Sequence, residues 1–307
     1  MKRDDFIDLR IVDNFYQTSS FYPMPVVLIG TINEDGITNL GPYSLCFPYY
    51  VAGKDYYAML LETRNNSNTA VNLFRNPHCT VNFIPDKRRF MKQCVALGYP
   101  GDTTEEKMKD CIFTLKPGLR GRGASPGEYP MIVAESFQVY ECIWDSSLEN
   151  GAKWSSVYEF TPPYNNFNGV TSEFGAHFIL KIEKILIAPR YGKQIISGVR
   201  RRGFPHVPVD YGYRDNMNFW FSRFRRPYRE KIPKNKGVEV TTVYYAANRI
   251  DPEVEFTEEA CEKLTKVPRI FLNTALKGCV EWAKENGIKE LHPEHMDTIR
   301  NKRSGEK

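Results

Sequence analysis

Residues 25–44 read PVVLIGTINEDGITNLGPYS, and this stretch decides the fold class. The first eight residues are β-branched and almost continuously apolar, as in a buried strand. The next four, 33–36, end in an Asp-Gly pair, and Gly36 supplies the positive-φ position of a hairpin turn. Residues 37–40 then resume as a returning strand. The stretch therefore predicts an antiparallel hairpin.

Further strand candidates follow, and few helices interleave with them. They are residues 55–62, 79–84, 137–143, 177–187 and 238–246. After His177, apolar and charged residues alternate, which is typical of one wall of an antiparallel sheet or barrel. A parallel α/β sheet would need regular helices between its strands. We therefore expect a mainly β chain with added helices, folded as an antiparallel barrel.

Helices are expected at two places in the barrel and throughout the tail. Ser67 and Thr103 can each cap a short helix. From residue 251 the pattern becomes helical, with Thr257 as a cap and Pro268 at the start of a longer helix. That helix would end at Gly287 and bury one stripe, formed by Phe271, Ala275, Cys279 and Ala283 with Leu272, Leu276 and Val280 beside them. We therefore divide the chain into residues 1–250, a barrel with insertions, and residues 251–307, a small helical domain.

Composition narrows the class of protein. The 307 residues are 41% hydrophobic, yet no apolar run reaches the roughly 20 residues of a membrane span. The first residues lack the apolar segment of a signal peptide. The seven cysteines are scattered and form no Cys-x-x-Cys pair, so we expect neither a disulfide framework nor a metal site. These features predict a cytoplasmic protein with reduced thiols and no membrane partner.

A basic, aromatic-rich stretch spans residues 200–231, within a net charge of +5. Basic grooves with stacking aromatics can bind single-stranded nucleic acid, but no nucleic-acid module surrounds this stretch. We therefore do not expect nucleic acid as a partner. The arginines could instead cover the aromatic rings or bind an anionic ligand. Together with the polar, aromatic excursion at 151–175, the stretch could form a lid over a ligand or enlarge a dimer interface.

A candidate phosphate site lies at residues 64–69, which read RNNSNT. A strand ends here and a helix begins, so backbone N–H groups and the helix dipole favour an anion. Ser67 and Thr69 add hydroxyl groups, and Arg64 adds a charged donor. The simpler interpretation is helix capping with Arg64 in solvent. The local sequence leaves both open.

A candidate site for a flat ring lies at residues 39–46, which read NLGPYSLC. Gly41 and Pro42 are expected to interrupt the strand ladder, so that backbone donors and acceptors can face a ligand. The simpler interpretation is an edge bulge that only bends the strand. Cys46 ends this stretch and could tune or react with a bound ring.

These stretches, in this order and spacing, resemble the flavin reductase-like, FMN-binding split-barrel family over about residues 20–190. Two later blocks, 134–142 and 175–185, also resemble it. The resemblance implies a Greek-key split barrel, usually a homodimer, with FMN near the subunit interface. Members reduce flavins with NADH or NADPH, or carry electrons in the manner of flavoredoxin.

The resemblance also implies roles for individual residues. The flavin ring and ribityl chain would lie along Asn39, Gly41, Pro42, Tyr43, Ser44, Leu45 and Cys46. The phosphate would be held by Arg64, Ser67, Asn68 and Thr69. His177 matches a position near the nicotinamide side in some members and is the expected catalytic residue. The long insertion, the basic stretch and the helical tail depart from the compact family pattern.

Residues 255–303 resemble the small helical domain that ends the B subunit of light-independent protochlorophyllide reductase. Phe256 to Ala260, Leu264 to Pro268 and Val280 to Gly287 carry that likeness. In that setting the domain sits beside a redox site. Here it could cover the flavin, dock an electron donor, or serve only as a packing module.

Three functions remain open on the sequence. The first is an FMN-dependent oxidoreductase that moves electrons between NAD(P)H or a reduced partner protein and a flavin or a small-molecule acceptor. The second is a flavoredoxin-like electron carrier. The third is a non-catalytic split-barrel module that binds haem or another ligand. Because a flavin carries the redox chemistry itself, the missing catalytic triads and paired carboxylates agree with the first two.

Overall fold

The structure is a computed structural model that describes residues 24–52, 56–98, 103–147, 167–197, 205–214, 219–222, 240–248 and 250–305. It divides into two compact units, residues 1–228 and 229–307, which are described separately below as the β unit and the helical unit. Most of the two segments proposed as a lid, 151–175 and 200–231, lie outside the described residues.

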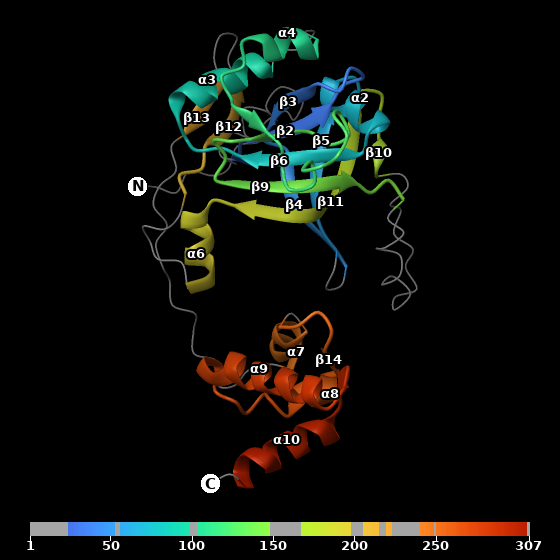
Figure 1. The fold of residues 1–307 in the computed structure, drawn as a ribbon. Coiled ribbons are helices and arrows are strands. Elements are labelled where there is room, and N and C mark those ends of the chain that lie inside the picture. Colours follow the sequence, from blue (N-terminus) through green and yellow to red (C-terminus); the bar gives the residue numbers. More distant parts are fainter. Residues whose placement is uncertain are drawn as a thin grey trace, which may run out of the picture. The chain divides into compact units, whose positions relative to one another are not determined.

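An antiparallel sheet forms the frame of the β unit (Figure 1). Its strands are β2 (Val27–Ile32), β3 (Thr38–Tyr43), β4 (Cys46–Ala52), β5 (Tyr56–Arg64), β6 (His78–Phe83), β9 (Gln138–Trp144), β10 (Gly169–Val170) and β11 (Gly175–Ile187). The order across the sheet is β3-β2-β6-β9-β11-β5-β4, and β10 pairs with β11. The sheet curls into a half-barrel, which confirms the expected split-barrel class. The β2–β3 hairpin is confirmed too, and Gly36 has a φ of 77° in its turn.

The two faces of the curled sheet bury separate cores. Inward-facing residues of β2, β5, β6 and β11 pack around Ala70 and Leu73 of α2 (Asn68–Arg75). Because α2 contacts β2, β3 and β5, it lies across the open side of the sheet. Alternate residues of β2, such as Leu28, point to the other face, where α3 (Arg88–Leu97) covers them. This alternation follows from the two-residue period of a strand.

Two helices follow β6 and pack against β3. The sequence analysis did not predict α3, which has no side-chain cap. The predicted cap at Thr103 is confirmed: α4 (Thr104–Lys109) starts with a capping box between Thr103 and Glu106. The Thr104 hydroxyl donates a hydrogen bond to Asn39 Oδ1 over 3.4 Å. This contact ties α4 to β3.

Short strands complete the β unit. The pair β7 (Leu115–Lys116) and β8 (Ile132–Val133) is antiparallel. The pair β12 (Val209–Arg214) and β13 (Phe219–Ser222) extends from β1 (Met24–Pro25), so part of the basic, aromatic stretch is a hairpin joined to the barrel. The helix α6 (Pro189–Ser197) follows β11.

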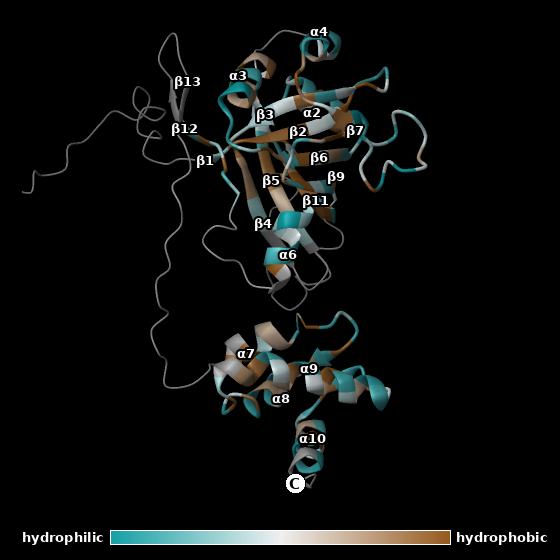
Figure 2. Ribbon diagram, turned by 60° about the vertical axis from the view of Figure 1, so that its left-hand side comes forward, coloured by the Kyte–Doolittle hydropathy of each residue, from teal (hydrophilic) through white to brown (hydrophobic). Residues whose placement is uncertain are grey.

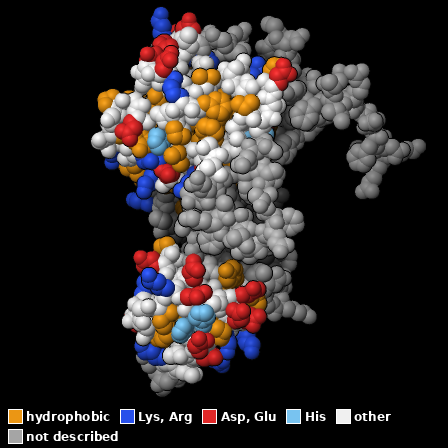
Figure 3. Space-filling view, turned by 90° about the vertical axis from the view of Figure 1, so that its right-hand side faces the viewer, with side chains coloured by type: hydrophobic (Ala, Val, Ile, Leu, Met, Phe, Trp, Pro, Cys, Tyr) orange, Lys and Arg blue, Asp and Glu red, His pale blue; other side chains and the backbone are white. Residues whose placement is uncertain are grey.

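Several apolar side chains remain exposed on the β unit. Figure 2 shows the hydropathy of the ribbon, and Figure 3 shows hydrophobic side chains gathered on one face of this unit. Val71 and Phe74 of α2 are 50% and 41% exposed, and Val170 and Phe174 are 62% and 71% exposed. The ring centroids of Trp144 and Phe74 are 5.4 Å apart. A Cβ on Gly169 would lie 3.9 Å from Trp144 Cζ2. We call Val71, Phe74, Val170 and Phe174 the α2–β10 patch.

The helical unit contains α7 (Val240–Ala247), α8 (Glu258–Glu262), α9 (Arg269–Glu285) and α10 (Pro293–Gly305), with a short parallel pair of β14 (Glu255–Phe256) and β15 (Glu290–Leu291). The strand predicted at 238–246 is wrong, because Val243 and Ala247 lie one helical turn apart and pack into this helical core. The predicted buried stripe of α9 is largely confirmed. Its buried members are Leu272, Leu276, Cys279, Val280 and Ala283. Ala275 is half-buried, and Phe271 departs from the prediction at 58% exposed.

The predicted end of α9 is confirmed. Gly287 has a φ of 69°, and Ile288 N donates to Ala283 O over 2.9 Å, as in a Schellman motif. Thr257 caps α8 by accepting a hydrogen bond from Ala260 N. None of the helices in the described part of the chain has the length and apolar character needed to cross a membrane.

Candidate functional site

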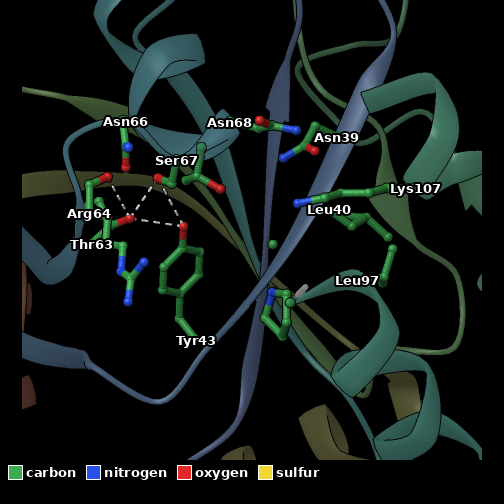
Figure 4. Close-up of a pocket in the computed structure, with 14 residues that line it drawn as sticks. Asn39, Leu40, Tyr43, Thr63, Arg64, Asn66, Ser67, Asn68, Leu97 and Lys107 are labelled. Carbon is green, nitrogen blue, oxygen red and sulfur yellow. Dashed lines mark hydrogen bonds between the residues drawn. The ribbon is translucent and has the colours of Figure 1, made fainter. Parts of the chain in front are cut away.

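A cavity of about 560 Å³ opens where β3, the end of β5, the start of α2, the end of α3 and α4 meet (Figure 4). Its lining includes eight of the residues predicted from the sequence: Asn39, Gly41, Pro42, Tyr43, Arg64, Ser67, Asn68 and Thr69. The two candidate stretches, 39–46 and 64–69, are separate in the sequence, and the fold brings residues of both together in one cavity. The volume lies within the range of ligand pockets in proteins.

One end of the cavity combines a helix N-terminus with a cationic side chain. Ser67 is the N-cap of α2, with extended φ and ψ of −68° and 150°, and its Oγ accepts from Ala70 N over 3.2 Å. The first-turn N–H groups of a helix lack intrahelical partners, so they and the helix dipole attract negative charge. Arg64 is exposed beside them, and its guanidinium forms no ion pair with any residue that the structure describes. Capping and anion binding are therefore compatible at this site.

Three hydroxyl groups join the elements around this end. Tyr43 Oη lies 3.0 Å from Thr63 Oγ1 and 3.4 Å from Ser67 Oγ, and the Thr63 and Ser67 oxygens are 2.7 Å apart. Figure 4 shows these bonds linking β3, β5 and the start of α2. The sequence analysis missed Thr63, which is the penultimate residue of β5. Its side chain faces the cavity because strand residues alternate, which places Thr63 on the opposite face of the sheet from Glu62.

Gly41 allows a close approach between β3 and α2. A Cβ on Gly41 would lie 2.6 Å from Thr69 Oγ1 and 2.8 Å from Tyr43 Cε2, both too short for van der Waals contact. The expectation that Gly41 and Pro42 interrupt the ladder is wrong. Gly41 pairs with Ile29 and Pro42 with Leu28 in a continuous register. Pro42 is tolerated because β3 is an edge strand, whose outer backbone groups have no neighbouring strand in the sheet.

The opposite wall comes from α3 and α4. Leu97 and Gly98 end α3, and a Cβ on Gly98 would lie 3.1 Å from Pro42 Cγ. Lys107 of α4 reaches the cavity beside Asn39, which is almost fully buried (Figure 4). The sequence analysis missed Leu97, Gly98 and Lys107. No local motif marks them, because only the packing of α3 and α4 on β3 brings them to the cavity.

Ser44, Leu45 and Cys46 do not line this cavity. Ser44 is half-buried, and Leu45 is 39% exposed with its carbonyl accepting from Glu62 N. The Cys46 side chain points into the barrel core, where Cys79 also lies. Burial, together with the neighbouring Cys79, raises the pKa of the Cys46 thiol to about 12. A thiol in this environment is a poor nucleophile.

His177 lies on β11, opposite Glu62 of β5 and outside the cavity lining. Its Nε2 is 3.7 Å from Glu62 Oε1, and its ring centroid is 4.7 Å from that of Phe167. The next residue pair, Ala176 and Thr63, points to the other face of the sheet, because strand residues alternate. His177 is therefore separated from the cavity by the thickness of the sheet.

The described residues contain no group of three or more His, Cys, Asp or Glu side chains placed to hold a metal ion. All seven cysteines are unbonded, and six of them are buried. The chemistry of the cavity therefore comes from hydroxyl, amide, cationic and backbone groups.

Comparison with known proteins identifies the fold. The chain matches no family model, and none of the curated proteins matches it significantly. Among solved structures it is similar to 2-nitrobenzoate 2-nitroreductase of Pseudomonas fluorescens, at 15% identity over 75% of this chain and 96% of that one, with a TM-score of 0.51. Nitrilotriacetate monooxygenase component B of Bacillus cereus gives 10% identity, 74% and 100% coverage and a TM-score of 0.51. Flavoredoxin of Methanosarcina acetivorans gives 14% identity, 76% and 98% coverage and a TM-score of 0.49.

Proposed function

Because the chain has the fold of the flavin reductase-like split-barrel proteins, we propose that it is an FMN-binding oxidoreductase. It transfers electrons between NAD(P)H or a reduced partner protein and a flavin or a small acceptor. The observation that carries this proposal is the cavity in which Arg64, the start of α2 and the edge of β3 meet.

The phosphate of FMN is assigned to the end formed by Arg64, Ser67, Asn68 and Thr69. The α2 N-terminus provides directed N–H groups, and Arg64 provides a planar cationic donor that suits phosphate oxygens. Thr69 Oγ1 lies close to Gly41, so the hydroxyl is held at the junction of α2 and β3. These groups bind and orient the phosphate.

The flavin ring is assigned to the side formed by β3 and the end of α3. The outer backbone groups of edge strand β3 can pair with the polar edge of the ring, and Leu97 offers an apolar surface. Asn39 adds a buried amide whose Oδ1 already accepts from Thr104. When bound, FMN would supply the two-electron redox chemistry, and the chain would hold it in place and limit its contact with water.

FMN is favoured over FAD by the number of anion sites. One helix N-terminus and one arginine meet at one end of the cavity, which matches a single phosphate group, whereas Lys107 lies on the opposite wall. A nicotinamide donor would dock transiently at the exposed ring. His177 is not assigned a role in this step, because it lies outside the cavity lining.

The cellular setting is part of the proposal. Unbonded, mostly buried cysteines suit a reducing compartment, so we propose a cytoplasmic location. We also propose a homodimer, for which the exposed α2–β10 patch is the structural argument.

Stopped-flow reduction of the FMN-loaded protein separates the oxidoreductase from its alternatives. Mixing it with NADH, NADPH and a reduced ferredoxin should bleach the flavin with at least one donor. Reduction by a nicotinamide supports the enzyme, and reduction by the protein donor alone supports a flavoredoxin-like carrier. A preparation that binds haem and takes up no flavin would instead support the non-catalytic binding module.

A further inference from the structure

The exposed face of α3 has a charge pattern that its helix does not favour. Lys87, Arg88, Arg89 and Lys92 are all exposed and lie within the first two turns. The first turn contains no acidic residue, and Lys87 provides no side-chain cap. Positive charge at a helix N-terminus opposes the helix dipole. A charge cluster that costs helix stability points to a role outside the helix.

These four side chains have no acidic partner within the described part of the chain. Lys87 and Arg89 approach the Phe90 ring, at 5.4 and 4.8 Å from its centroid. None of the four forms an ion pair with a described residue, although Arg120, Lys263 and Lys284 do. Asp86 is the nearest acidic residue in sequence, and its backbone N–H donates to His206 O. The cations therefore present their charge to solvent.

The same helix leads directly to the cavity. Its charged N-terminal turn is hydrophilic in Figure 2, and its last residue, Leu97, lines the proposed flavin site. A helix of ten residues is about 15 Å long, so the cations lie within about one helix length of the cavity. Val95 lies one turn beyond Lys92 on the same face of α3 and is 36% exposed. The surface thus passes from charged to apolar towards the cavity.

We infer that this α3 face is a docking surface for a small acidic electron-transfer protein that delivers electrons to the cofactor in the cavity. The inference rests on the proposed function. Lys87, Arg88, Arg89 and Lys92 attract and orient the acidic partner, and Val95 forms the apolar contact. Electron-transfer encounters are weak and use small interfaces, so one short helix face is sufficient. Nucleic acid is disfavoured because the cations cover less than two helical turns rather than a groove.

Reversing two charges on this face tests the inference without weakening the fold. Arg88 and Lys92 lie one turn apart, so the variant Arg88→Glu/Lys92→Glu replaces one like-charged pair with another. A carboxylate at position 88 also complements the helix dipole, so we expect unchanged or slightly higher thermal stability. The control, Arg122→Glu/Lys184→Glu, makes the same change in net charge at two exposed residues outside α3 and outside the cavity lining.

The readout is stopped-flow reduction of the FMN-loaded full chain by a reduced acidic [2Fe–2S] ferredoxin. At about 0.01 M salt, where the Debye length is about 30 Å, we expect Arg88→Glu/Lys92→Glu to lower the second-order rate constant about tenfold or more. The control should stay close to the parent, and the difference should largely disappear at about 1 M salt. FMN affinity and reduction by dithionite should be equal in all three proteins.

Equal rate constants for the parent and the α3 variant would overturn the inference, and so would a ferredoxin that fails to reduce the parent. Loss of single-stranded DNA binding in the α3 variant, with an unchanged ferredoxin rate, would overturn it in favour of nucleic acid. If the parent binds no FMN, the proposed function itself fails. If FMN binds and NADH reduces it while the ferredoxin results are negative, only the docking surface is rejected.

Discussion

Arg64 is the residue on which the phosphate end of the cavity depends most. Its guanidinium flanks the start of α2 and has no ion-pair partner among the described residues. Arg64→Ala removes a charge-assisted hydrogen bond worth about 1.5–3 kcal/mol, so FMN affinity should fall roughly tenfold to a hundredfold. Thr69→Ala should cost less. Titration of the purified variants with FMN measures both.

The control for this prediction is Arg122→Ala, which removes another exposed arginine outside the cavity. Its FMN affinity should equal that of the parent. If Arg64→Ala and Thr69→Ala also bind FMN as well as the parent does, the phosphate lies elsewhere.

Gly41 tests the close contact between β3 and α2. In Gly41→Ala the new methyl group would meet Thr69 Oγ1 at 2.6 Å and the Tyr43 ring at 2.8 Å, so one of these side chains must move. Overpacking of this kind costs about 1–3 kcal/mol of unfolding free energy. We expect a lower thermal midpoint and weaker FMN binding. Gly121→Ala is the control, because its Cβ would meet nothing closer than 3.8 Å.

At the scale of single elements, we propose that the start of α2 has a binding role in addition to its structural one. Ser67→Ala removes the N-cap bond to Ala70 N and the contacts with Tyr43 and Thr63. Loss of a serine cap costs about 0.5–2 kcal/mol of stability. We expect that loss together with weaker FMN binding, measured by thermal unfolding and by titration.

Thr257→Ala provides the matched control. It removes the N-cap bond of α8 in the helical unit, a comparable interaction with no residue in the cavity lining. Stability should fall by a similar amount while FMN affinity stays unchanged. Equal FMN affinity in Ser67→Ala and the parent would show that capping is the sole role of Ser67.

The sequence predicts elements best where a local signal and the fold agree. The β2–β3 hairpin and the caps at Ser67, Thr103 and Thr257 depend on neighbouring residues, and all four are confirmed. The run at 238–246 is β-branched and was predicted as a strand, yet it is helical because it packs into a helical core. Tertiary packing overrides local propensity there.

Site prediction fails where residues meet only through tertiary packing. Lys107 and Leu97 reach the cavity because α3 and α4 cover β3, and nothing near them in sequence marks a ligand site. The opposite error occurs at Cys46, the last residue of the predicted ring stretch, which does not line the cavity. Strand alternation turns its side chain into the core. The spacing of Phe90, Cys94 and Leu97 would have revealed α3, because it matches one helix face.

At the scale of the whole molecule, the exposed apolar surface predicts self-association. The α2–β10 patch has no cover among the described residues, and the sheet ends in two edge strands, β3 and β4. Proteins usually cover such patches and edges by pairing. We expect a homodimer in solution by light scattering.

A charged residue in the patch tests where the dimer forms. Val71→Glu should shift the protein towards monomer, whereas Ile195→Glu, at a 60% exposed residue of α6, should leave the dimer intact. Monomer alone at high concentration of the parent would contradict the proposed homodimer. An intact dimer in Val71→Glu would place the interface elsewhere.

The helical unit has its own core. The relation of this unit to the small domain of protochlorophyllide reductase, which its sequence resembles, stays a prediction. Val254, Leu276 and Ile299 are among its buried residues, so it folds around a separate cluster. The stopped-flow experiments with electron donors use the full chain, so the helical unit is present in them.

The central claim is that the cavity binds FMN through its phosphate, and a comparison of three flavins tests it most directly. The purified full chain is titrated with FMN, riboflavin and FAD while flavin fluorescence is followed. We expect FMN to bind with micromolar or tighter affinity and riboflavin, which lacks the phosphate, to bind at least about tenfold more weakly. Tight binding of FAD without binding of FMN, or equal affinity for FMN and riboflavin, would contradict the account.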